Sequence, residues 1–203
     1  MENIEHSFYI NLDKRVDRKE LIEKELKNYG INAERFSGIY CPPPKGIVGC
    51  TKSHLQVIKL AKERKYRNVL IFEDDLCFLK SKEEIEDNIR KLFKYKPDFD
   101  VCFLSYNLHE GEVNMEYPFL TNVINSATAS CYIINGHYYD KLIALYEHAV
   151  PLLDKTMEHW NYANDQIWKI LQKQDNWYCF TTRLGKQRDG FSDNANKSIA
   201  YNC

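Results

Sequence analysis

The chain has 203 residues, of which 44% are hydrophobic and 28% charged, and its formal net charge is −1. This composition predicts one well-buried globular domain and excludes a mostly disordered chain. The absence of a basic excess argues against a nucleic-acid-binding protein. Because the sequence shows neither a bilayer-length apolar stretch nor a signal-peptide pattern, we expect no transmembrane segment and a cytoplasmic location. Seven scattered cysteines without a C-x-x-C pair favour reduced thiols.

Apolar strand-like runs alternate with amphipathic helical patterns along the first half of the chain. The pattern predicts strands over 6–11, 33–36 and 68–72. A helix is expected to open near Asp13, and a second is expected to begin with Thr51 as its N-cap. The segment 37–49 contains three consecutive prolines and three glycines, which predicts a loop.

The second half continues the alternation. It predicts, in order, a helix over 85–93, a strand over 100–105, a functional loop over 106–125, a strand over 129–134, a helix over 136–148, a helix from about 164 and a strand over 176–181. Alternating strands and helices predict a single α/β domain over 1–203, with a mostly parallel central sheet flanked by helices. The polar tail, about 182–203, is expected to fold over the active site.

The most informative segment is the apolar run 68–72, which ends in the carboxylates Glu73, Asp74 and Asp75. Three adjacent acids repel one another, and a divalent cation removes that repulsion. Hard cations such as Mn²⁺ or Mg²⁺ prefer oxygen ligands. Ligands of open α/β sheets bind beyond the carboxyl ends of the strands. The segment therefore predicts a metal–diphosphate site, with a solvated acidic turn as the alternative.

Cationic and small residues at two predicted helix starts suit an anionic ligand. Arg15 and Arg18 fall on one face at the start of the first helix, where they could bind a phosphate or simply pair with neighbouring aspartates. The segment 49–54 places Ser53 and His54 near a helix N-terminus. His54 is either a structural core histidine or a post that orients the acidic cluster.

Two aspartates are candidates for a general base. Asp165 lies at a predicted helix start beside Trp160 and Tyr162, whose rings could stack on a sugar. Asp154 is a second candidate of the same kind. An aspartate at a helix start is equally explained by N-capping. In the tail, Asp193 could complete a metal shell, although its sequence context also fits a simple turn.

Four motifs, in order, resemble glycosyltransferase family 25. They are Phe8–Asp13 with Arg15 and Arg18, then Glu34–Ile39, Gly49–His54 and Leu70–Asp75. The segment from Gln187 to Asp193 is similar to the terminal pattern of that family. The family includes bacterial lipooligosaccharide galactosyltransferases and procollagen hydroxylysine galactosyltransferases. The resemblance covers about the first 80 residues well and the segment 106–163 poorly.

The resemblance implies a GT-A fold and an inverting, metal-dependent transfer of galactose or glucose from a UDP-sugar. The acceptor would be a hydroxyl of a glycan or of hydroxylysine in a collagen-like protein, and the cofactor Mn²⁺ or Mg²⁺. The implied site residues are Glu73, Asp75 and Asp193 for the metal; Asn11, Leu12, Arg15, Ser53, Asp74 and Gln187 for the nucleotide sugar; and Asp165, or Asp154, for the base. Glu73 and Asp75 are expected to share one side of an extended chain. A non-catalytic nucleotide-sugar or carbohydrate-binding module of the same fold is the alternative, and homodimerisation stays open.

Overall fold

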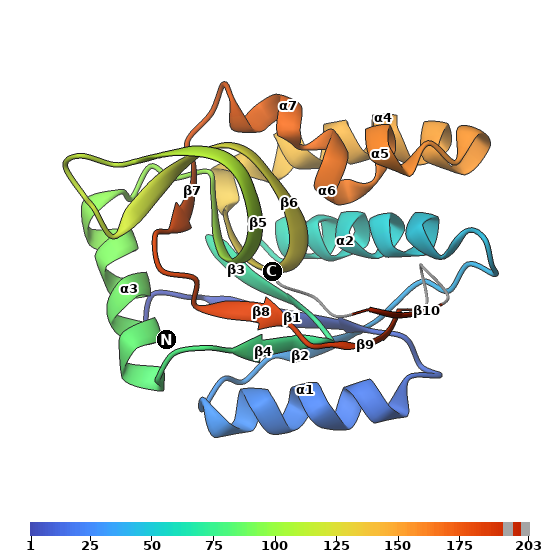
Figure 1. Cartoon of the computed structure of the whole chain (residues 1–203), viewed down its shortest axis with the longest axis horizontal. Helices are drawn as coiled ribbons and strands as arrows, with labels where there is room; N and C mark the ends of the chain where they lie inside the picture. The colour runs from blue at the N-terminus through green and yellow to red at the C-terminus, as the bar shows by residue number, and fades with distance from the viewer. Residues whose placement is uncertain (193–196, 200–203) are drawn as a thin grey trace.

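A six-stranded mixed sheet forms the centre of the protein, in the order β2-β1-β3-β6-β5-β7 (Figure 1). The structure is a computed structural model and describes residues 1–192 and 197–199. The strands are β1 His6–Asn11, β2 Glu34–Ser37, β3 Asn68–Glu73, β5 Val101–Val113, β6 Leu120–Asn135 and β7 Trp177–Phe180. Within this sheet β6 runs antiparallel to β3, β5 and β7, whereas β1 runs parallel to β2 and β3, and β5 parallel to β7. The predicted mostly parallel α/β fold is confirmed.

Helices cover both faces of the sheet. The long ones are α1 Val16–Asn28, α2 Gly46–Glu63, α3 Lys82–Tyr95 and α4 Tyr139–Thr156. Shorter turns follow at η1 Gly136–Tyr138, α5 His159–Tyr162, α6 Asn164–Ile167 and α7 Lys169–Gln172. In the part of the chain that the structure describes, no helix combines the length and the apolar character needed to cross a membrane.

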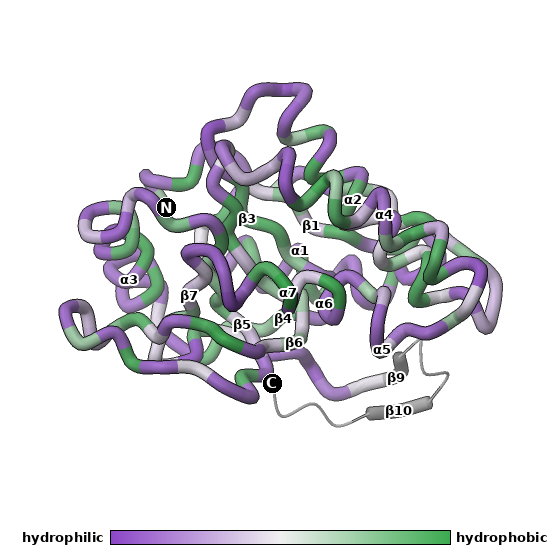
Figure 2. The backbone as a smooth tube through the Cα atoms, turned by 90° about the horizontal axis from the view of Figure 1, so that it is seen from above, coloured by the Kyte–Doolittle hydropathy of each residue, from purple (hydrophilic) through white to green (hydrophobic). Residues whose placement is uncertain are grey.

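The central strand β3 is buried on both faces and separates two hydrophobic clusters. Val69 and Ile71 pack in the cluster that α2 and α4 complete, and Leu70 and Phe72 pack in the one that α1 and α3 complete. This alternation follows from the two-residue period of a strand. Figure 2 shows β3 as a hydrophobic segment within the fold. Because β3 is covered on both faces, only its ends approach solvent. The acids that follow it therefore lie at the carboxyl-terminal end of the central strand.

Two local predictions are wrong. Helix α2 begins at Gly46, so Thr51 lies within the helix and does not cap it; its hydroxyl donates to the carbonyl of Ile47 at 3.0 Å. Glycines at 46 and 49 weaken the helical signal in that segment. The predicted functional loop over 106–125 is instead occupied mainly by the long hairpin of β5 and β6. The outer part of β5 is exposed, which conceals its strand pattern, whereas β6 keeps Leu120 and Val123 in the core.

The described part of the C-terminal tail forms short strands. Strand β8, Gly185–Gln187, pairs antiparallel with β4, Leu76–Phe78, in a register that places Gln187 beside Leu76. Strand β9, Gly190–Ser192, pairs with β10, Lys197–Ile199. The β4–β8 pairing brings the tail next to the acidic residues that precede β4. Asp193 lies outside the described residues.

Helix α2 holds the loop that follows β2 by close backbone contact. A Cβ added at Gly49 would lie 2.3 Å from the carbonyl oxygen of Ile39 and 3.1 Å from the nitrogen of Cys41. The Ser53 hydroxyl reinforces this contact, because it accepts from the Ile39 amide at 2.8 Å and donates to the Gly49 carbonyl at 2.8 Å. Glycine at position 49 therefore fixes the position of the loop.

We predict that Gly49→Ala destabilises the protein. Alanine in a helix normally gains up to about 1 kcal/mol over glycine, but overpacking costs about 1–3 kcal/mol, and the clash here is with backbone that cannot rotate away. We expect a net loss of about 1 kcal/mol or more in the free energy of unfolding, measured by urea denaturation. The matched control is Gly190→Ala, whose Cβ would meet nothing within 4 Å. Equal stability of the two variants would contradict the close approach.

Candidate functional site

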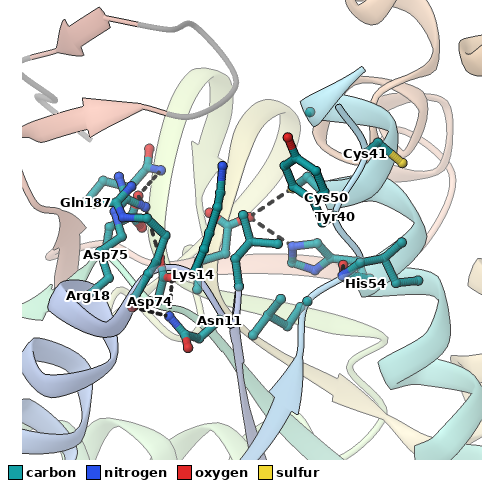
Figure 3. Close-up of a pocket in the computed structure, with 18 of the residues that line it drawn as sticks. Asn11, Lys14, Arg18, Tyr40, Cys41, Cys50, His54, Asp74, Asp75 and Gln187 are labelled. Carbon is teal, nitrogen blue, oxygen red and sulfur yellow. Dashed lines mark hydrogen bonds and ion pairs between the residues drawn. The ribbon is translucent and has the colours of Figure 1, made fainter. Parts of the chain in front are cut away.

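A pocket of about 300 Å³ opens at the carboxyl ends of β1 and β3, between the starts of α1 and α2 (Figure 3). The register explains the location, because the parallel pairing of β1 with β3 sets Ile10 opposite Glu73. The residues that line it include Asn11, Leu12, Arg15, Arg18, Ser53, His54, Glu73, Asp74, Asp75 and Gln187. All four sequence motifs thus meet in one cavity, the second through Gly38 and Ile39, together with one residue of the tail.

Asp74 is held by two donors. The Asn11 side-chain amide donates to Asp74 Oδ2 at 2.8 Å, and Arg18 Nη1 donates to Oδ1 at 2.9 Å. Arg35 in turn donates to Asn11 Oδ1 at 3.1 Å, which fixes the orientation of that amide. Burial raises the pKa of Asp74 although Arg18 and Asn11 oppose the rise. Its carboxylate is therefore a positioned group and not a solvated surface charge.

Asp75 is the least satisfied of the three acids. Its Oδ2 accepts from Arg18 at 3.1 Å and from Gln187 at 3.5 Å. Its Oδ1 is buried and has no hydrogen-bond partner among the described residues. Burial is the main cause that raises the pKa of Asp75 to about 7, and the negative charge of Glu73 is the second. A buried carboxylate oxygen without a donor fits a divalent cation, which would supply the missing positive charge.

Glu73 is oriented by a hydrogen-bonded chain from a different side. His54 Nε2 lies 2.9 Å from Glu73 Oε1, and His54 Nδ1 lies 2.7 Å from the Tyr132 hydroxyl. The Cys50 thiol lies 3.6 Å from the same glutamate oxygen. Burial alone would raise the pKa of Glu73, but the hydrogen bond and the charge of His54 outweigh it, so the pKa is lowered.

The turn at the end of β3 separates the acids. Strand β3 ends at Glu73, and the next two residues form a turn. The two-residue strand period therefore does not apply between Glu73 and Asp75. Glu73 contacts α2, whereas Asp75 contacts α1 and β8. Figure 3 shows Asp74, Asp75 and Arg18 on one side of the pocket, and Cys50 and His54 on the other.

Three further residues implied by the resemblance also line the pocket. Arg15 makes two hydrogen bonds to the Asp17 carboxylate, at 2.9 and 2.7 Å, as the simple pairing alternative expects. Ser53 is buried and its hydroxyl positions the Ile39 amide, so it shapes the wall. Leu12 supplies apolar lining. At the mouth, Tyr40 is 55% exposed, with Lys14 Nζ 4.6 Å from its ring centroid.

The two candidate bases occupy very different environments. Asp165, at the start of α6, accepts from the Thr128 amide at 3.1 Å. Burial, together with the charge of Glu73, raises its pKa. Thr128 has a φ of +76°, which is strained for a β-branched residue. Asp154 is 39% exposed and pairs with Lys45 and Lys52, and the hydrogen bond from Lys45 lowers its pKa.

Several contributors to the site carried no usable sequence signal. Tyr132 lies in an apolar strand and reads as a core residue, yet its hydroxyl contacts His54. Cys50 was visible only as part of a motif, without a role. The sequence predicts Arg18 either as a phosphate ligand or as a partner of neighbouring aspartates, and its bridge to Asp74 and Asp75 depends on how α1 packs against the end of β3. These roles arise from long-range contacts.

Comparisons with known proteins find a distant sequence relative and several solved structures of similar fold. No protein-family model matches the chain. A candidate glycosyltransferase of Acanthamoeba polyphaga mimivirus is 29% identical over 46% of this chain and 34% of its own length. The chain therefore spans about a third of that curated relative.

Solved structures with a similar fold include a glycosyltransferase involved in the glycosylation of the major capsid of PBCV-1, at a TM-score of 0.54 and 12% identity over 92% of this chain and 93% of that one. A protein from STIV matches at 0.51, with 14% identity over 98% and 94%. UDP-glucose pyrophosphorylase complexed with UDP-glucose matches at 0.51, with 8% identity over 89% and 91%. The chain has the α/β fold of these glycosyltransferase and nucleotidyltransferase structures.

Proposed function

We propose that the chain is an inverting, metal-dependent glycosyltransferase that uses a UDP-sugar. The observation that carries this proposal is the buried Oδ1 of Asp75, which has no partner among the residues that the structure describes, in a pocket that also contains the guanidinium of Arg18 and the amide of Asn11. A bound cation would compensate the carboxylate charges in that cavity, and a bound diphosphate would compensate the charge of Arg18. The distant mimivirus relative and the shared fold support the class of reaction.

The residues present fit a hard divalent cation. Asp75 is the principal proposed ligand, Glu73 the second, and Asp193 a proposed third from outside the described residues. When bound, Mn²⁺ or Mg²⁺ would stabilise the negative charge of the departing diphosphate. Arg18 pairs with both Asp74 and Asp75 and lines the same pocket, where it could also bind a phosphate.

The remaining pocket residues are assigned to the donor. Arg15 is proposed to bind phosphate oxygens, while Asn11, Leu12 and Ser53 shape the nucleoside pocket. Asp74, already fixed by Asn11 and Arg18, is oriented to accept from a ribose or sugar hydroxyl. Tail residue Gln187 closes the pocket beside Asp75.

Asp165 is the proposed general base. It takes the proton of the acceptor hydroxyl as that oxygen bonds to the anomeric carbon and the bond from that carbon to the diphosphate breaks, which inverts the configuration. Its raised pKa brings it nearer to the working pH, which favours a base. Asp154 is tied to two lysines and is more acidic, so it is the weaker candidate. The proposed donor sugar is galactose or glucose, and the proposed acceptor a glycan or a protein hydroxyl such as hydroxylysine.

The test is a screen of nucleotide sugars with Mn²⁺, read as released nucleotide, with a metal-free arm as the control. We expect release from a UDP-hexose only in the presence of metal. Metal-dependent UDP binding without turnover on any donor or acceptor would favour the non-catalytic module. The absence of both turnover and UDP binding would refute the assignment to this class.

Removal of the base separates chemistry from binding. We expect Asp165→Asn to lower transfer by about 10²–10⁴-fold while UDP binding, measured by calorimetry, stays close to that of the parent. Asp154→Asn is the matched substitution and should reduce transfer far less. The reverse order would assign the base to Asp154.

Metal binding should strengthen with pH because the ligand carboxylates must be ionised. With a pKa of about 7, Asp75 changes from about 10% to about 90% ionised between pH 6 and pH 8. We expect Mn²⁺ to raise Tm more at pH 8 than at pH 6, with an apparent affinity about tenfold higher. Asp75→Asn should abolish this increment.

The metal-free protein should show the opposite trend. A carboxyl whose folded pKa lies above its ordinary value contributes stability below that ordinary value and loses it as pH rises towards 7. In a chelator, Asp75→Asn should therefore be more stable than the parent at pH 8, with the difference vanishing near pH 4. A parent that is the more stable protein at pH 8 in chelator would contradict the buried, incompletely compensated state of the Asp75 carboxyl.

A further inference from the structure

We propose that Cys50, His54 and Glu73 form a second cation site that binds Zn²⁺ in preference to Mn²⁺. Cys50 and His54 are four residues apart on α2 and so share one face of the helix. Figure 3 shows both projecting into the same part of the pocket. Glu73 arrives from the end of β3, opposite them. The thiol, imidazole and carboxylate donor atoms all lie within 4.8 Å of one another.

Two of the three distances between the donor atoms are close to those around a tetrahedral ion, and the third, from Cys50 Sγ to the His54 donor nitrogen, is within 4.8 Å. Bonds of about 2.0–2.3 Å at tetrahedral angles place neighbouring donor atoms about 3.3–3.7 Å apart. Cys50 Sγ lies 3.6 Å from Glu73 Oε1, and His54 Nε2 lies 2.9 Å from the same oxygen. The second pair has to open by only a few tenths of an ångström. Rotation of the glutamate side chain can supply this opening.

The donor set decides which ion binds. Mn²⁺ and Mg²⁺ favour oxygen ligands, whereas a thiolate and an imidazole favour Zn²⁺. Asp75, which offers only oxygen, therefore suits the first class of ion, and the Cys50–His54–Glu73 set suits the second. Three protein ligands leave a fourth tetrahedral position for water, as in zinc sites that remain open. All three residues line the pocket, so an ion can reach them from solvent.

The surroundings of His54 are those of a metal-ligating imidazole. Such a histidine is usually fixed through its second nitrogen, and His54 Nδ1 lies 2.7 Å from the Tyr132 hydroxyl. A hydroxyl can accept as well as donate, so Nδ1–H can point to Tyr132 and leave the Nε2 lone pair for the ion. Zinc would then replace the hydrogen bond between Nε2 and Glu73.

Occupation of this site would withdraw Glu73 from the proposed donor metal site. Zinc is therefore expected to oppose Mn²⁺-supported transfer, a consequence that rests on the proposed function. Zinc binding itself does not rest on it, because its ligands are assembled without any nucleotide. The test accordingly measures binding to the full chain with no nucleotide sugar present. A negative zinc-binding result would not bear on the transfer assay. A negative transfer assay would not bear on zinc binding.

Cobalt(II) reports the site directly as a spectroscopic substitute for zinc. We expect one equivalent of Co²⁺ to produce a thiolate-to-cobalt charge-transfer band, which Zn²⁺ removes and excess Mn²⁺ does not. Cys50→Ser should abolish the band. The matched control is Cys41→Ser, which removes a different thiol lining the same pocket and should leave the band intact. Absence of the band in the parent, or its persistence in Cys50→Ser, would overturn the proposal.

A second measurement needs no variant and so does not depend on folding of a mutant. Zinc should slow alkylation of Cys50 several-fold, mapped by mass spectrometry, and leave alkylation of Cys41 unchanged. Equal protection of both thiols, or protection of neither, would show that Cys50 is not a ligand.

Discussion

Mutual repulsion among three adjacent, largely buried carboxylates is the constraint on which the site depends. The fold meets it by placing donors from several elements around the three acids. Glu73 pairs with His54 from α2, Asp74 takes the Asn11 amide and one contact from Arg18, and Asp75 shares Arg18 with it. Asp75 is left incompletely compensated, with one oxygen unpartnered among the described residues. The charge that the fold does not supply is therefore concentrated on a single carboxyl, which is where a cation would contribute most.

The architecture of the sheet brings these partners together. Parallel pairing of β1 with β3 places Asn11 and the acids at the carboxyl ends of these two strands. The first turn of α1 places Arg18 beside them. Antiparallel β6 pairs Tyr132 with Ile71, beneath the helix that carries His54. The contacts of Gly49 and Ser53 with the loop after β2 set the opposite wall. A change in any of these packings would move a partner of the acids without touching the acids themselves.

The sequence is informative where a signal is local and periodic. Strands β1 and β3, helix α3 and the position of the acidic residues after β3 follow from apolar spacing, and the ordered motifs bring the right segments to one pocket. The hairpin of β5 and β6 escapes prediction because the outer part of β5 is exposed and lacks an apolar alternation, although Leu120 and Val123 of β6 are buried. Thr51 is misread as a cap because two glycines obscure the first turn of α2. The contacts of Tyr132 with His54 and of Arg18 with two acids span 78, 56 and 57 positions, and such pairs carry no local pattern.

Glu73 and Asp75 show how one short segment can present two different electrostatic states. The hydrogen bond from His54 lowers the pKa of Glu73, whereas burial and the charge of Glu73 raise that of Asp75. Environments that push two carboxyl pKa values apart assign them distinct roles. The imidazole, thiol and glutamate form a site for a borderline-soft ion, and Asp75 offers a site for a hard one. Because Glu73 belongs to both sets, the position of its carboxylate couples the two sites. An ion that binds Glu73 together with Cys50 and His54 reduces the negative charge beside Asp75. The affinity of Asp75 for its own cation should then fall.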